Sequence, residues 1–152
     1  MKKFMSILFV LLLFGFIGLL AASFIIDDMT SKNIESTLNS ISPPSGTTIE
    51  QSVSRTGKIT TKNGAVQYYG AILLQSNQPY AVLKGYYEKA NKPEQYDVTL
   101  IPLSDAASYF GPNMPGELRF SHHDSAPDGY YIVYAFGEAQ MPFPMFDFRS
   151  YF

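Results

Sequence analysis

The chain has no cysteine among its 152 residues, and this absence excludes several kinds of chemistry. Without thiols the chain forms no disulfides, no thiolate metal sites and no lipid attachment at cysteine. A thiol nucleophile is excluded for the same reason. The folded part must therefore be stabilised by packing and hydrogen bonding alone.

Tryptophan is also absent and charge is sparse, with 11 Lys and Arg against 13 Asp and Glu. The basic residues form no cluster, whereas nucleic-acid binding depends on neutralising a phosphate backbone. Nucleic acid is therefore not an expected partner. Two catalytic motifs are missing as well: no G-x-S-x-G elbow occurs, and Gly57–Thr60 (GKIT) lacks the upstream glycine of a phosphate loop.

An apolar run from Phe4 to Ile26 contains no charged residue. As a helix it would be about 34 Å long, slightly more than the hydrocarbon thickness of a bilayer. Two lysines precede the run and two aspartates follow it, which predicts an N-terminus in the cytoplasm. We therefore expect residues 1–26 to be a single-pass anchor in the cytoplasmic membrane, surrounded by lipid, with the C-terminal part outside.

A cleaved signal peptide is the alternative, because Ala21-Ala22-Ser23 resembles a cleavage site of small residues. The run exceeds the roughly 7 to 15 apolar residues of a typical signal, and it continues past the candidate cut. These lengths favour a retained anchor. Cleavage near Ser23 would instead yield a secreted protein.

Residues 27–46 are expected to form a juxtamembrane helix and linker. Ile34, Leu38 and Ile41 recur at the spacing of one helical face, and the proline pair in SPPSG disfavours further helix. A helix this short is marginal in water by itself. It is therefore either a stalk or a lid packed on the domain.

Residues 47–140 are expected to form one α+β domain, an antiparallel sheet of about five strands with one or two helices packed on one face. The continuous apolar run Ala71–Leu74 indicates a strand covered on both faces. An Asn63-Gly64 pair indicates a hairpin before it. The predicted strands are 47–60, 63–76, 95–103, 116–122 and 129–138.

One helix is expected between the second and third strands. Pro79 would lie in its first turn, with Ser76 or Asn77 as the cap, and Leu83 and Tyr87 would share a buried stripe. Further along, the segment 104–115 is rich in Pro, Gly and Asn. It is expected to be an irregular link and a candidate rim for a site.

The stretch PPSGTTIEQSVSRTGKIT and the later NGAVQYYGAILLQSNQPYAVLKGYYEK contain a Pro, Gly and Thr turn, a GK strand, an Asn-Gly hairpin and a YYGAIL strand before a helix with YY. Through these motifs, Pro43 to Lys89 resembles a group of small membrane-anchored bacterial envelope proteins of unassigned biochemistry. The match covers less than half of the chain, and its motifs are structural. The resemblance implies an envelope-anchored domain and no catalytic residues.

His122 and His123 are the only histidines, and Asp124 follows them. Consecutive residues on a strand point to opposite faces, so both imidazoles do not readily meet one ion. A hydrated loop is the favoured interpretation, and we assign no catalytic residue, metal or cofactor. The alternative is a small envelope hydrolase or metal-dependent enzyme that uses these histidines with carboxylates such as Glu50, Glu117 and Glu138.

The segment 141–152 (MPFPMFDFRSYF) is strongly aromatic. A wrap over the domain's apolar face is the favoured interpretation, because exposed aromatic patches are normally avoided. The second interpretation is a docking segment, and the last strand of an outer-membrane barrel is a poorer third. The candidate partner-binding residues are Phe143, Phe146, Phe148, Arg149, Tyr151 and Phe152.

Together these patterns predict a non-enzymatic, membrane-anchored extracytoplasmic domain that binds another envelope component, with an envelope protein as the expected partner. A groove for a glycan or peptide is a further hypothesis, although paired tyrosines usually divide into one core and one surface residue. The four tyrosines concerned are Tyr68, Tyr69, Tyr86 and Tyr87. The sequence identifies no small-molecule ligand.

Overall fold

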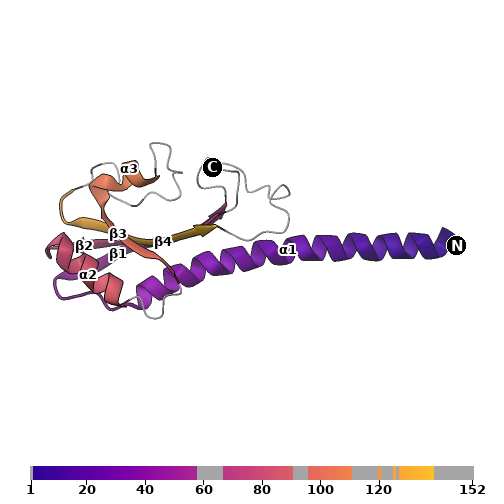
Figure 1. Cartoon of the computed structure of the whole chain (residues 1–152), viewed down its shortest axis with the longest axis horizontal. Coiled ribbons are helices and arrows are strands. Elements are labelled where there is room, and N and C mark those ends of the chain that lie inside the picture. Colours follow the sequence, from indigo (N-terminus) through magenta and orange to yellow (C-terminus); the bar gives the residue numbers. More distant parts are fainter. Residues whose placement is uncertain are drawn as a thin grey trace.

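The computed structural model describes residues 2–57, 67–90, 96–110, 120, 125 and 127–138. Figure 1 shows a small α+β body from which one long helix projects, with the N-terminus at the remote end of that helix. The elements in chain order are α1 (Lys2–Ser40), β1 (Thr47–Gly57), β2 (Gln67–Ser76), α2 (Tyr80–Ala90), β3 (Val98–Pro102), the 3-10 helix η1 (Leu103–Asp105), α3 (Ala106–Phe110) and β4 (Tyr130–Glu138).

The helix α1 is unbroken for 39 residues, about 58 Å, and passes position 26, where the predicted anchor gives way to the juxtamembrane segment. Its window Met5–Ala22 is long and apolar enough to cross a membrane, and no part of that window is buried in the protein. A signal sequence near the N-terminus can meet the same criterion of length and composition. Farther along the same helix, Ile34 and Leu38 are fully buried, so the predicted helical face does pack on the domain.

The sheet has the order β1-β2-β4-β3, and every neighbouring pair is antiparallel. The predicted antiparallel α+β class is therefore confirmed, but its details need correction. The described residues form four strands and three α-helices rather than about five strands and one or two helices. Of the predicted strand 116–122, only Phe120 is described, and it lies outside any strand; Asn63-Gly64 also falls outside the described residues.

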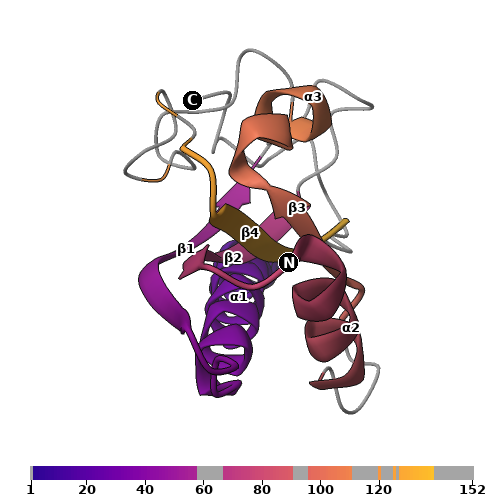
Figure 2. The same cartoon turned by 90° about the vertical axis from the view of Figure 1, so that its left-hand side faces the viewer.

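Helical structure covers both faces of this sheet, whereas helices on one face were predicted. In Figure 2, α1 and α2 lie on one side of the strands and α3 lies on the other. The central strand β2 consequently alternates between two cores: Ala71 and Leu73 pack toward η1 and α3, while Ile72 and Leu74 pack toward α1 and α2. All four side chains are fully buried, which confirms the prediction drawn from the continuous apolar run.

The segment 103–110 is helical, although 104–115 was predicted as an irregular link. Leu103 and Ala106 are buried against the sheet, and they supply the packing that holds η1 and the first turn of α3 in place. A short helix depends on such tertiary contacts rather than on propensity, and single-sequence patterns do not reveal them. Residues 111–115 lie outside the described part.

The helix α2 begins later than its predicted cap. The Pro79 carbonyl accepts hydrogen bonds from the backbone N–H groups of Val82 and Leu83, at 3.0 and 3.2 Å. The Ser76 hydroxyl instead accepts the Gln78 N–H at 3.1 Å, before the helix begins. Pro79 directly precedes Tyr80, so the assignment of Ser76 or Asn77 as the cap is wrong. The predicted stripe is correct at its centre, where Leu83 and Tyr87 are buried.

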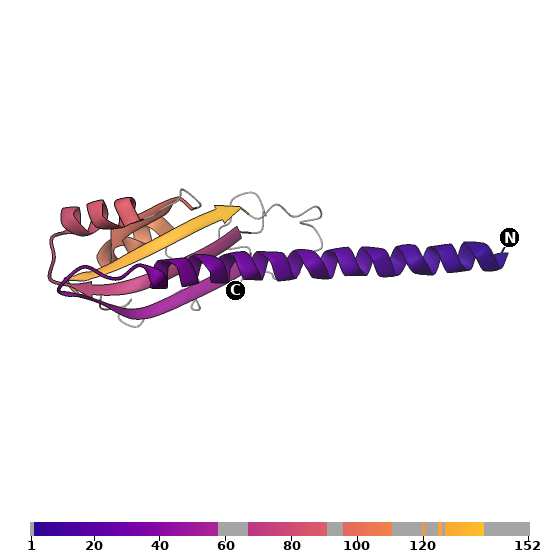
Figure 3. The ribbon, with the colours of Figure 1, turned by 90° about the horizontal axis from the view of Figure 1, so that it is seen from below.

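Polar contacts hold α1 along β1. The Glu35 carboxylate accepts hydrogen bonds from the hydroxyls of Ser52 at 2.7 Å and Ser54 at 2.5 Å. One helical turn earlier, the Ser31 hydroxyl accepts a hydrogen bond from Thr56 at 3.1 Å. Helix numbering rises as strand numbering falls, so α1 and β1 run in opposite directions, side by side as in Figure 3.

This pairing gives the sheet two distinct ends. Strand register brings Gly57, Gln67 and Glu138 together at the end beside Ser31, which we call the near end because it faces the apolar half of α1. At the other end, Thr47 pairs with Ser76 and Gln75 pairs with Tyr130. We call it the far end. Since β1 has 11 residues, the two ends are about 35 Å apart.

Candidate functional site at the far end of the sheet

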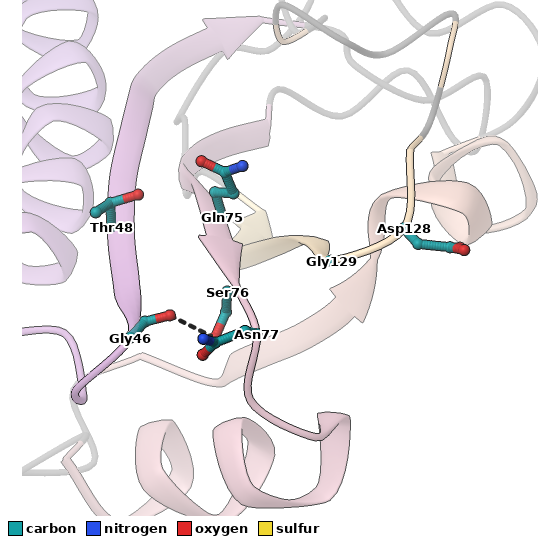
Figure 4. Close-up of a pocket in the computed structure, with 7 residues that line it drawn as sticks. All are labelled: Gly46, Thr48, Gln75, Ser76, Asn77, Asp128 and Gly129. Carbon is teal, nitrogen blue, oxygen red and sulfur yellow. Dashed lines mark hydrogen bonds between the residues drawn. The ribbon is translucent and has the colours of Figure 1, made fainter.

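A hollow of about 410 Å³ opens at the far end, formed by residues from three chain segments (Figure 4). One segment leads into β1, the second leaves β2 and the third leads into β4. The hollow therefore exists only because the sheet register aligns three distant stretches of sequence. Its lining residues are Gly46, Thr48, Gln75, Ser76, Asn77, Asp128 and Gly129.

A turn ending at Gly46 builds the first wall. The Thr47 N–H donates to the Pro44 carbonyl at 3.1 Å, which closes a four-residue turn, and Gly46 has φ +74°. The Asn77 N–H then donates to the Gly46 carbonyl at 3.3 Å. The backbone angle favours glycine at position 46, and a Cβ there would also displace the exposed Asn77 side-chain oxygen.

The opposite wall depends on a second glycine of positive φ, Gly129 at +82°. Its carbonyl accepts the Ser76 N–H at 2.8 Å. A Cβ on residue 129 would lie 2.9 Å from the Ser76 carbonyl oxygen, too close for an ordinary contact. The turn chemistry predicted for Pro127-Asp128-Gly129 is thus observed, and it joins β4 to the end of β2.

The Ser76 hydroxyl lies at the floor of the hollow and is committed to structural contacts. It lies 2.6 Å from the Thr47 hydroxyl, and it accepts the Gln78 N–H. Ser76 is 7% exposed and Thr47 is 8% exposed. Buried hydroxyls need such partners, so this pair fixes the start of β1 against the end of β2.

The groups that reach the open space are polar and mostly neutral. Gln75 and Asn77 present exposed carboxamides, and Thr48 presents a hydroxyl that donates to Glu50 at 2.7 Å. In Figure 4 the Asp128 carboxylate points away from the other lining residues. Carboxamides both donate and accept hydrogen bonds, so the hollow suits a neutral ligand such as a peptide backbone or sugar hydroxyls.

Acidic side chains and histidines do not form a metal site within the described part of the chain, where no group of three or more could hold an ion. Glu50 is exposed beside Thr48, and the backbone of Glu138 ends β4. The other residues of the enzymatic alternative, His122, His123 and Glu117, fall outside the described residues. So do the six aromatic-tail candidates, Phe143, Phe146, Phe148, Arg149, Tyr151 and Phe152.

The four paired tyrosines form no common groove. Tyr69 is fully buried in the core on the α3 face, whereas Tyr87 is buried in the core on the α1 and α2 face. Their neighbours Tyr68 and Tyr86 are half-buried and pack against the core on the α1 and α2 face, so neither is the surface residue that was predicted. Desolvation by burial, with a smaller contribution from Tyr86, raises the pKa of Tyr87 to about 12. Burial also raises the pKa of Tyr69.

Sequence reasoning recognised the turns at Gly46 and Gly129 but not the hollow between them. The signal that was available is the pair of glycine turns flanking two strands. What was missing is the register that sets Ser76 between those turns.

Comparison of the whole chain with known protein families, with curated proteins and with solved structures found no match. The resemblance to small envelope-anchored proteins therefore stays a prediction.

Proposed function

We propose that the protein is a non-enzymatic membrane protein, anchored by α1 with its N-terminus in the cytoplasm, whose outward-facing domain binds another envelope component through the far-end hollow. An envelope protein is the expected partner. The hollow's exposed carboxamides would pair with backbone or other neutral polar groups of that partner.

The observation that carries this proposal is the continuity of α1. The same unbroken helix exposes an apolar stretch from Met5 onward and buries Ile34 and Leu38 in the domain core. A helix has no internal hinge of the kind that a glycine-rich linker provides. The domain is therefore held to the apolar segment in one orientation, with the hollow at the end that faces away from it.

Exposure beyond the candidate cleavage site favours a retained anchor. Ile25, Ile26 and Met29 are 59, 61 and 60% exposed in the protein. Cleavage near Ser23 would leave these side chains in water at a new N-terminus, although exposing apolar side chains costs free energy. In a retained anchor, the first two complete the lipid-facing surface instead.

Anchoring also explains how a shallow polar hollow can be sufficient for binding. Confinement to the membrane plane raises the effective concentration of neighbouring membrane proteins, so weak contacts are occupied. The hollow presents hydrogen-bonding groups without a large apolar patch, which suits a reversible accessory interaction.

Site-specific photo-crosslinking in native membranes tests this function. A benzophenone amino acid at Gln75, inside the hollow, is expected to crosslink one reproducible envelope protein. The same photoprobe at Lys84, exposed on α2, is the matched control and is expected to give no such product. Equal products from both positions, or a chain that crosslinks to nothing at Gln75, would contradict the proposal.

A further inference from the structure

We propose that the domain rests on the lipid headgroups of the membrane that α1 crosses, with the near end of its sheet turned toward them. This inference rests on the anchoring in the proposed function and adds a second, lipid-facing surface to the domain. The occupant is the headgroup layer itself, and the contact would fix the direction in which the far-end hollow points.

The first step is the height of the domain on its helix. The apolar run ends at Ile26, and Ser31 is the first helix residue buried by the sheet, at 3% exposure. These positions are five residues apart, about 7.5 Å along the axis. The headgroup region of one leaflet is about 5–7 Å thick. The domain therefore begins where the headgroups end, and no layer of water separates the two.

The second step is the register that sets which part of the domain lies at this height. Thr56 donates to Ser31, and Gly57 follows it at the end of β1. Gly57 pairs with Gln67, which pairs in turn with Glu138. The three strand ends consequently share one level, just above the headgroups.

The third step is the distribution of described charges. Lys32 and Arg55 are both exposed at the near end, beside Ser31 and Thr56, and so are the acidic Asp28 and Asp97. The exposed charges around the far end are acidic: Glu50, Asp105 and Asp128. Basic side chains near a bilayer surface are attracted to anionic lipid, and acidic side chains are not. Lys32 and Arg55 can therefore be attracted to anionic headgroups, but Asp28 and Asp97 oppose this attraction, so charge alone does not set the orientation.

Tyr68 and Tyr96 add interfacial side chains to the same end. Both are half-buried, and Tyr68 lies over Gly137, where any Cβ would collide with its ring. Tyrosine suits a membrane–water boundary because its ring is apolar and its hydroxyl is polar. Tyr68 belongs to β2 and Tyr96 lies two residues before β3, and both rings pack against the core on the α1 and α2 face.

The absence of cysteine allows a direct test on the full chain. Two exposed aspartates mark the two ends: Asp97 lies close to the near end and Asp128 lies at the far end. D97C and D128C are therefore matched sites for a nitroxide label. The chain is reconstituted into phosphatidylcholine–phosphatidylglycerol vesicles that carry a nickel-chelating headgroup lipid. Nickel relaxes nitroxides over short range, and the two sites are about 25 Å apart along the strands.

The expected result is strong relaxation at D97C and background relaxation at D128C. A seven-residue helical insert between Met29 and Thr30 provides the control. It raises the domain by about 10 Å and leaves the rotation of the domain about the helix axis nearly unchanged. With the insert, relaxation at D97C is expected to fall to background. An insert that leaves the D97C signal unchanged would contradict headgroup contact by the aligned near end.

Carbonate extraction of the same vesicles tests the membrane anchor separately from the headgroup contact. Background or equal relaxation at both sites, in a chain that carbonate leaves in the membrane, would overturn the headgroup contact while the anchor stands. Release of the chain by carbonate would overturn the anchor and the contact together.

Discussion

Gly70 of β2 lies directly against Ile34 of α1, so closely that a Cβ on residue 70 would come within 2.7 Å of the Ile34 Cβ and 2.9 Å of the Glu35 backbone nitrogen. The missing side chain lets the helix approach the sheet at the level where Glu35 bonds to β1. The helix with the exposed apolar half is thereby also part of the domain core.

Replacing Gly70 with alanine is expected to destabilise the fold by about 1–3 kcal/mol, because the added methyl group must push α1 away from β2. The matched control is Gly85→Ala on α2, where a Cβ would have no neighbour within 4 Å. That change should stabilise the protein by about 0.5–1 kcal/mol, since alanine favours helix. Urea unfolding of the full chain in detergent measures both, and midpoint shifts of the same sign would contradict the close packing.

Glu35→Ala is expected to lower the free energy of unfolding by about 1–3 kcal/mol, because Ser52 and Ser54 lose a charged acceptor at the half-buried joint between α1 and β1. Glu88→Ala is its control, since Glu88 pairs with Lys84 only at 3.9 Å on the exposed face of α2. That change should cost less than about 0.5 kcal/mol. Equal losses in the same urea experiment would rule out a structural joint at Glu35.

Tyr87→Phe is expected to leave stability unchanged or to raise it slightly. The Tyr87 hydroxyl is buried without a hydrogen-bond partner among the described residues, so its removal relieves a desolvated group. Tyr80→Phe should instead cost about 0.5–1.5 kcal/mol, because the Tyr80 hydroxyl donates to the Leu100 carbonyl at 3.0 Å. Thermal unfolding of the two variants distinguishes them, and a loss at Tyr87 as large as that at Tyr80 would disprove this assignment.

Tyr87 also predicts a pH dependence. An unfolded tyrosine titrates near pH 10, whereas burial raises the pKa of Tyr87 to about 12 in the fold. The folded state therefore holds a proton that the unfolded state has lost, and stability decreases as pH rises from about 10 to 12. Tyr87→Phe should make this decrease shallower, leaving the contribution of buried Tyr69. Urea midpoints across this range test it, and an unchanged slope would count against the assignment.

Gly129→Ala is expected to destabilise the far end by about 1–3 kcal/mol, because the residue has φ +82° and an added Cβ meets the Ser76 carbonyl. Gly129→Asn separates the two causes, since asparagine tolerates the angle better but keeps the Cβ. An asparagine variant as stable as the wild type would show that the contact with Ser76 is unimportant. Crosslinking from Gln75 should weaken in step with the loss of stability.

Local patterns predicted those parts of the fold that depend on a few neighbouring residues. The apolar run Ala71–Leu74 revealed a strand covered on both faces, and the spacing of Ile34 and Leu38 revealed the helix face that packs on it. Gly46 and Gly129 indicated turns for the same reason, because positive φ is a property of single residues.

The rest depends on pairings between distant residues. The strand order places β4 between β2 and β3, and no local spacing encodes that choice. The far-end hollow needs Ser76 to bond both to Thr47, at the start of β1, and to Gly129, in the turn before β4. The short helix α3 depends on burial of Ala106 against the sheet. Each of these features is fixed by tertiary contacts that override or supplement propensity.

The intact mass of the protein recovered from native membranes tests most directly whether α1 is retained as one anchoring helix. A retained helix predicts a chain that keeps its N-terminal apolar segment, residues 4–26. A mature chain that begins at Phe24 would contradict it, because the segment that ties the domain to the bilayer would have been removed.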